Sequence, residues 1–195
     1  MNLLTGTNST IPGFSSMPFD IGKAISIVHY FSGRGVVYGL GSKARNLDAP
    51  IDETFQFAPG QDCAPKSIDC SGMKRLLLRR CSGENGTGVL CPDGSFTQNE
   101  WMASTGFKHD IIPAPFSPDY LQNLNPRYVY DCYCKTGSRG ERIGHTWLLV
   151  NINGKWWSLE SHGGHGPDMR PWDTPILAQI VTDIYPIGMN TPLTP

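Results

Sequence analysis

The sequence predicts an α+β domain built around an antiparallel sheet, and three observations lead to that prediction. Helical patterns lie in the first half of the chain, strand patterns gather in the second half, and an Asn153-Gly154 pair joins two predicted strands. Helices followed by a run of strands are typical of α+β domains. An Asn-Gly pair between alternating segments is the strongest short signal for an antiparallel hairpin.

Length and composition fit one globular domain, or one domain with an extension. The chain has 195 residues, of which 39% are hydrophobic and 10% aromatic. Its formal net charge of −1 lacks the basic excess typical of nucleic-acid-binding proteins, so no nucleic-acid partner is expected. No stretch approaches the ~18 consecutive apolar residues of a membrane span.

The N-terminal part is expected to be an irregular arm followed by a helix. Residues 1–20 are rich in Ser, Thr, Pro and Gly, and they show neither the basic nor the apolar region of a secretory signal peptide. Residues 21–31 have a helical pattern, with Asp20 as N-cap and Gly33 and Gly35 breaking the helix.

Two more helices are predicted before the strands begin. In 69–81 the apolar residues recur at helical spacing, Asp69 can cap the N-terminus, and Arg79 and Arg80 favour the last turn. The segment 97–105 is the second of these helices.

The second half of the chain predicts strands and a Pro-rich extension. Strand patterns occupy 127–134, 145–151 and 155–162. The C-terminal part, 163–195, is Pro-rich, and a short strand or helix is expected within 176–185.

The six cysteines leave two interpretations open. An even number is compatible with disulfides, and a bridge between Cys81 and Cys91 would close a Gly-rich loop. Structural zinc is disfavoured, because the closest pair, Cys132 and Cys134, lacks the spacing of a zinc module. We expect no metal and no organic cofactor.

Cys70 stands at the start of the helix predicted for 69–81. The helix dipole and the free N–H groups of a first turn favour a thiolate, which makes such a cysteine a candidate nucleophile. Gly72 leaves room there for the close approach of a backbone or a ligand. The alternative is a small buried residue that only begins a helix.

A thiolate nucleophile needs a base, and His145 at a strand start is the candidate. A two-residue turn at Asn153-Gly154 places His145 opposite His162 and puts both on one face with Glu160. Glu160 or His162 could then orient the imidazole, as the third member of a triad does. The alternative is that both face solvent. Trp156 shares this face and is expected to wall the cleft.

In combination these segments resemble the NlpC/P60 family of papain-like cysteine peptidases. The resemblance covers about residues 21–165 and rests on Tyr38-Gly39, Asp69-Cys70-Ser71-Gly72, Gly144-His145 and Glu160. It implies a papain-like fold in which a central antiparallel sheet packs against the helix that carries the nucleophile. The catalytic domain would span 21–195, including the Pro-rich extension.

The resemblance also implies roles for individual residues. Cys70 becomes the nucleophile, His145 the base and Glu160 the orienting residue. Tyr38 lines the site and hydrogen-bonds near the nucleophile, and the backbone N–H groups near Cys70 and Ser71 form the oxyanion hole. The chain departs from the family pattern after Tyr38, where Gly39-Leu40-Gly41 replaces a Gly-Gly pair.

The function implied is that of a cysteine endopeptidase that cleaves an amide in the peptide stem of bacterial peptidoglycan. Without a classical signal peptide, such an enzyme would reach the periplasm or cell wall as a secretion-system toxin, with an immunity protein in the producing cell, or as a phage-associated lysin. The alternatives are a Cys–His amidase or acyltransferase of the same architecture, and a catalytically inactive wall-binding module.

Overall fold

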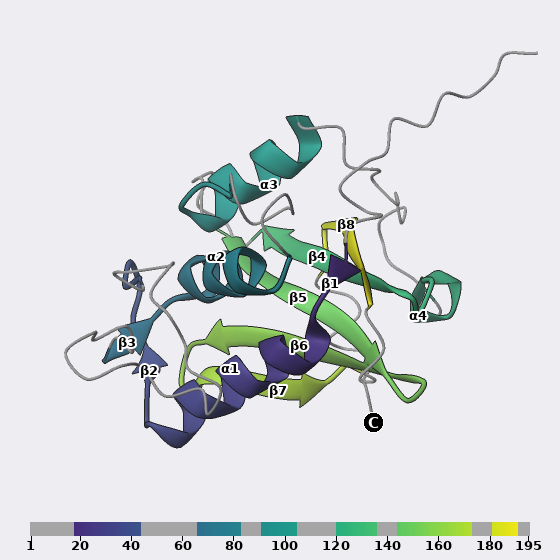
Figure 1. Ribbon diagram of the computed structural model, residues 1–195. Helices are drawn as coiled ribbons and strands as arrows, with labels where there is room; N and C mark the ends of the chain where they lie inside the picture. Colours follow the sequence, from purple (N-terminus) through teal and green to yellow (C-terminus); the bar gives the residue numbers. More distant parts are fainter. Residues whose placement is uncertain are drawn as a thin grey trace, which may run out of the picture.

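In the computed structural model, a six-stranded sheet carries its three longer helices on one face (Figure 1). The structure describes residues 18–43, 66–82, 91–104, 120–135, 144–172 and 181–190. The helices are α1 (Ile21–Gly33), α2 (Cys70–Cys81), α3 (Ser95–Ser104) and α4 (Tyr120–Asn123). The predicted α+β class is confirmed. None of the helices in the described ranges is long and apolar enough to cross a bilayer.

The strands fall into two sheets. Their bounds are β1 (Pro18–Phe19), β2 (Val37–Tyr38), β3 (Ser67–Ile68), β4 (Tyr128–Lys135), β5 (Gly144–Ile152), β6 (Lys155–His162), β7 (Gly166–Pro171) and β8 (Asp183–Asn190). The large sheet has the order β1-β8-β4-β5-β6-β7, and β2 pairs with β3 in a small parallel sheet. Within the large sheet only β1 and β8 run parallel, so its central part is antiparallel, as predicted.

The hairpin of β5 and β6 has the predicted register. Ile152 pairs with Lys155, and the ladder continues in step to Leu148 and Leu159. Asn153 and Gly154 both have positive φ, 51° and 81°, which is the backbone of a type I′ turn.

Both ends of the chain contribute more to the sheet than the sequence predicted. Pro18–Phe19, assigned to an irregular arm, form β1 and pair with β8. The segment 163–195 is not a mere extension, because β7 and β8 are strands of the main sheet. Residues 1–17, also part of the predicted arm, lie outside the described residues.

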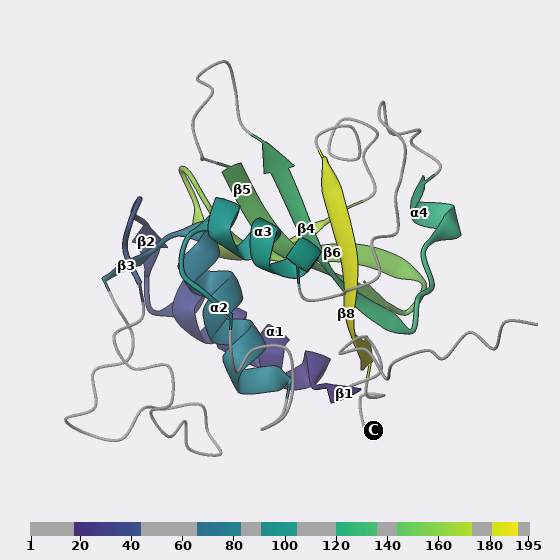
Figure 2. The same ribbon diagram turned by 90° about the horizontal axis from the view of Figure 1, so that it is seen from above.

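Two apolar clusters cover the two faces of the sheet. The first joins α1 and α2 to one face, with Phe31 and Leu77 packed in the same cluster as Leu148 and Leu159. Figure 2 shows α1 and α2 side by side along this face. The second cluster lies on the other face and contains Trp147. The helix that begins at Cys70 is therefore packed directly on the strands that carry the other candidate residues.

A buried ion pair ties α2 to the centre of the sheet. Lys74 of α2 is 1% exposed, and its Nζ lies 2.7 Å from Oδ2 of Asp131 on β4, which is 2% exposed. The hydroxyl of Thr146 on β5 donates to the Cys132 carbonyl at 2.9 Å and contacts Asp131 at 3.4 Å. This polar connection joins the helix to β4 and β5 one turn after Cys70.

Candidate active site

Cys70 is the first residue of α2, as predicted. The Asp69 side chain accepts the N–H of Gly72 at 2.7 Å and caps the helix. Gly72 is needed because a Cβ there would lie 3.0 Å from the carbonyl oxygen of Ser42 and 2.9 Å from Cδ of Lys43. The predicted close approach at Gly72 is thus made by the segment that follows β2.

The start of α2 lies where β5 and β6 diverge. Their ladder ends at Leu148 and Leu159, and the described residues beyond that point pair with the outer neighbours, β4 and β7. Two contacts place the helix there. The hydroxyl of Ser161 on β6 donates to the carbonyl of Ile68 at 2.7 Å, and Sγ of Cys70 lies 4.0 Å from the carbonyl oxygen of Gly144 on β5.

The ionisation of Cys70 is coupled to that of His145. Burial alone would raise the pKa of the Cys70 thiol, but a hydrogen bond and the charge of His145, together with the backbone N–H of Thr146, lower it. Burial alone would lower the pKa of His145, but hydrogen bonds to Cys70 and Glu160 raise it to about 9. Each group therefore favours the charged form of the other, a thiolate beside an imidazolium.

Glu160 is the partner of His145 on its other side. Oε2 of Glu160 lies 2.6 Å from Nε2 of His145, and the carboxylate is 3% exposed. Ser158 donates to Oε1 of Glu160 at 2.7 Å. The pKa of Glu160, which burial would raise, is lowered chiefly by its hydrogen bond to His145. The ring of Trp147 stacks on the imidazole at 5.4 Å between centroids, so both the plane and the hydrogen bond of His145 are held.

Of the two residues proposed for the third position, the structure brings only Glu160 against His145. His162 lies two residues further along β6, and its Nε2 lies 3.8 Å from Oδ2 of Asp168 on β7. Burial lowers the pKa of His162, which differs in sign from the shift at His145. The predicted face shared by His145 and Glu160 is confirmed by their hydrogen bond. The predicted pairing of His145 with His162 is wrong, because the two strands diverge beyond Leu148 and Leu159, and His145 pairs with Cys134 while His162 pairs with Gly166.

The three predicted substrate-binding residues lie in different settings. Tyr38 on β2 pairs with Ile68, two residues before the nucleophile, and burial, followed by the charges of Cys70 and Asp69, raises its pKa. Ser71 is buried, with its hydroxyl bonded to Asp69 at 3.0 Å and to Nζ of Lys43 at 2.6 Å. This hydroxyl is engaged within the protein.

Trp156 does not line the site. It pairs with Asn151 at the turn end of the hairpin, six residues from His145, or roughly 20 Å along the strand. Its ring packs on Tyr130 at 5.9 Å between centroids. The prediction that Trp156 shares a strand face with His145 was correct, but the two residues lie toward opposite ends of the hairpin.

Cys70 differs from the other described cysteines. Cys70, Cys81, Cys91, Cys132 and Cys134 are all free and buried, so the suggested bridge between Cys81 and Cys91 is absent. Burial raises the pKa of the other four, whereas that of Cys70 is lowered. Cys63 lies outside the described residues.

Several residues around the site were not predicted. Lys43 reaches Asp69, Ser71 and Asp93, and it places a positive charge beside the helix start. Gln98 of α3 is fully buried and donates to the carbonyl of Ser71 at 3.0 Å. No sequence motif marks either residue, because both reach the site through contacts between distant segments.

Gly144 has a steric reason to be glycine. A Cβ at this position would overlap the ring of Tyr133 on β4. Tyr133 pairs with Thr146, two residues after Gly144 on β5. The ring therefore lies against the backbone of β5 at the point where Cys70 approaches. This close packing explains the glycine of the Gly144-His145 pair.

The arrangement has the parts of nucleophilic acyl transfer: a thiol whose pKa is lowered, an imidazole that lowers it, and a carboxylate hydrogen-bonded to that imidazole. No protein-family model matches the chain, and no curated protein matches it either.

Proposed function

We propose that the protein is a cysteine hydrolase that works by acyl transfer through the thiolate of Cys70. The observation that carries this proposal is the electrostatic coupling of Cys70 to His145, whose imidazole is hydrogen-bonded to Glu160. A structural ion pair could perturb one pKa, but here a nucleophile, a base and an orienting carboxylate occur together. Among the described cysteines only the one at this site has a lowered pKa.

The reaction begins with attack of the Cys70 thiolate on the carbonyl carbon of an amide. His145, an imidazolium at neutral pH because its pKa is about 9, gives its proton to the leaving amine. The C–N bond breaks and a thioester to Cys70 remains. The imidazole, now neutral, takes a proton from water, which attacks the thioester and releases the acid and the thiolate.

The surrounding residues support these steps. Glu160 and Trp147 hold the ring of His145 in one orientation throughout the proton transfers. The first-turn N–H groups of a helix have no partner within the helix, and those of Cys70 and Ser71 adjoin the nucleophile. Two such donors at a developing oxyanion are worth about 3–4 kcal/mol each.

The substrate in this proposal is the peptide stem of bacterial peptidoglycan, and the reaction is that of an endopeptidase. Support for this substrate comes from the resemblance of Tyr38-Gly39, Asp69-Cys70-Ser71-Gly72 and Gly144-His145 to the NlpC/P60 pattern. The same resemblance supports a papain-like arrangement of the domain. The residues themselves support acyl transfer at an amide and leave the identity of that amide to the experiment.

Digestion of purified peptidoglycan, read by mass spectrometry of the soluble fragments, tests the proposal. The wild type is expected to release fragments cut within the stem peptide, and Cys70→Ala none. Cys81→Ala makes the same chemical change at the other end of α2, about 16 Å away, and is expected to keep the activity. Cleavage only at the bond between sugar and stem would identify an amidase instead. Binding without any cleavage, or cleavage by Cys70→Ala, would overturn the proposal.

A further inference from the structure

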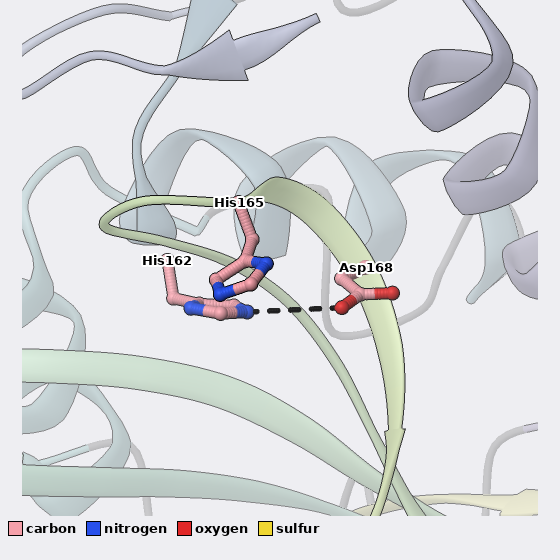
Figure 3. Close-up of side chains that lie close together, drawn as sticks. All are labelled: His162, His165 and Asp168. Carbon is pink, nitrogen blue, oxygen red and sulfur yellow. Dashed lines mark ion pairs between the residues drawn. The ribbon is translucent and has the colours of Figure 1, made fainter. Parts of the chain in front are cut away.

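A cluster of three metal-ligating side chains lies at the turn between β6 and β7, outside the machinery described above. His162 ends β6, His165 lies in the turn, and Asp168 lies on β7. One ligand atom from each, two imidazole nitrogens and a carboxylate oxygen, lies within 4.8 Å of the others. Figure 3 shows the two rings next to each other with the carboxylate of Asp168 facing them.

The backbone of this turn holds the three residues in place. The N–H of His165 donates to the carbonyl of His162 at 3.2 Å, and His162 pairs with Gly166 across the turn. Gly164 and Gly166 have φ of 89° and 82°, which permits this tight reversal. The three side chains are therefore brought together by short-range structure.

The spacing of the ligand atoms fits a metal ion better than direct bonding. Nε2 of His162 lies 3.8 Å from Oδ2 of Asp168, which is too long for a hydrogen bond. Zinc bonds of about 2.0–2.2 Å put two ligands of a tetrahedral centre about 3.4 Å apart. The distance between Nε2 of His162 and Oδ2 of Asp168 exceeds that spacing by about 0.4 Å. The ligand atom of His165 lies within 4.8 Å of the other two, and this side chain is exposed, so it has room to adjust on binding.

Two further features prepare the site for a cation. Nε2 of His162 is buried and has no hydrogen-bond partner among the described residues. Oδ1 of Asp168 accepts the N–H of Met169 at 2.8 Å, which fixes the carboxylate and leaves Oδ2 facing His162. Metal-binding carboxylates are commonly oriented by such a second contact.

We propose that His162, His165 and Asp168 form a binding site for a borderline first-row divalent cation such as Zn²⁺. Two imidazoles and one carboxylate are ligands that suit zinc and its neighbours rather than calcium or magnesium. The set leaves a fourth position for water or another ligand. The bound ion would cross-link the turn that follows Glu160 on β6, so the site would stabilise the strand end that holds the partner of His145.

Metal binding is tested on the purified full chain by equilibrium dialysis with Zn²⁺ and by visible absorption with Co²⁺. The wild type is expected to bind one ion, with a Co²⁺ spectrum that lacks a sulfur charge-transfer band, and to unfold at higher temperature with Zn²⁺ present. His165→Ala removes an exposed ligand. It is expected to weaken metal binding by at least about 10–100-fold, because even the loss of a residue that hydrogen-bonds to a metal ligand weakens binding by that much. His29→Ala removes an exposed histidine from α1 and should bind as the wild type does.

The reactive thiolate is the competing ligand, and Cys70→Ser separates the two. Retention of full Co²⁺ and Zn²⁺ binding in Cys70→Ser supports the proposed site and does not depend on whether the protein is a hydrolase. Loss of binding in Cys70→Ser, unchanged binding in His165→Ala, or absence of saturable binding by the wild type would overturn the inference.

Discussion

His145 is the residue on which the chemistry of the site depends, because it contacts both the nucleophile and the orienting carboxylate. Beside Cys70, the imidazole can take the proton of the thiol and so generate the thiolate. The contact with Glu160, at 2.6 Å between Nε2 and Oε2, leaves the other ring nitrogen for the sulfur. Both contacts raise the pKa of His145, to about 9. Since the raised pKa favours the charged ring, the imidazolium persists at neutral pH and is lost as the pH rises through about 9.

Glu160→Gln is expected to lower the pKa of His145 from about 9 toward its ordinary value of 6.5. The amide removes the negative charge that favours the imidazolium and can hold the ring in the wrong tautomer. Peptidoglycan cleavage should fall by about 10²–10⁴-fold, the usual worth of a positioned acid–base group. Imidazole nitrogen chemical shifts followed against pH report the pKa directly.

His162→Gln is the matched control on the same strand. Its side chain lies toward Asp168 rather than His145, so in metal-free protein the pKa of His145 and the cleavage rate should stay close to those of the wild type. If His162→Gln lowered the pKa of His145 and Glu160→Gln did not, the assignment of the third residue would be reversed.

Among single residues, the sequence predicted those that belong to local patterns. Cys70 was predictable because it follows a capping Asp69, and Glu160 because the Asn153-Gly154 turn determines its register with β5. Lys43 was not predictable, because its contacts with Asp69 and Ser71 join segments 26 and 28 positions apart without a shared motif.

At the level of the elements, the divergence of β5 and β6 creates the site. Where the ladder ends, the start of α2 contacts both strands, through Ile68 and Ser161 on one side and through Cys70 and Gly144 on the other. His145 shares a strand face with Trp147, which belongs to the cluster opposite the helices. Nucleophile and base thus come from opposite faces of the sheet and meet at its open end.

Gly144→Ala is expected to damage both stability and reactivity. The added methyl group would overlap the Tyr133 ring, so either the ring or the start of β5 must move. Overpacking of this kind costs about 1–3 kcal/mol in the free energy of unfolding, measured by urea denaturation. The rate of Cys70 alkylation should fall as well, because β5 carries His145.

Gly33→Ala is the matched control for that substitution. Nothing lies within 4 Å of a Cβ at Gly33, the last residue of α1. Its free energy of unfolding should be unchanged or slightly higher, because alanine has the better helix propensity. Equal losses in the two variants would show that the contact with Tyr133 is unimportant.

The buried pair of Lys74 and Asp131 connects α2 with β4 and allows a separate test of how the helix is seated. Lys74→Met leaves the Asp131 carboxylate buried without its partner, which should lower the free energy of unfolding by about 3–5 kcal/mol. The double variant Lys74→Met with Asp131→Leu should recover most of that loss, since an apolar pair replaces both charges. Additive losses in the double-mutant cycle would contradict a direct interaction between the two groups.

The limits of sequence reasoning at this level lie in long-range pairing. Short-range signals predicted α1, α2 and the β5–β6 hairpin, because caps and turns act within a few residues. The insertion of β8 between β1 and β4 joins opposite ends of the chain, and no periodicity encodes which strands become neighbours. The same limit explains why Trp156 was placed on the correct face but at the wrong end of its strand.

At the scale of the whole molecule, the packing of the two apolar clusters brings Cys70 and His145 together, although 75 positions separate them in the sequence. One cluster presses α1 and α2 on the sheet, and the other immobilises the face that carries His145 and Trp147. Four further thiols are buried with raised pKa values, so the fold confines thiolate chemistry among the described residues to one sulfur.

The most direct test of this account is the rate at which iodoacetamide alkylates the folded protein at pH 6, read by intact mass and peptide mapping. A single adduct should form first at Cys70, and His145→Ala should slow it, because the loss of the imidazole raises the thiol pKa and so lowers the thiolate fraction. His162→Ala should react as the wild type does. Equally slow labelling of all the cysteines, or a Cys70 rate that does not change in His145→Ala, would contradict the thiolate–imidazolium pair and the hydrolase built on it.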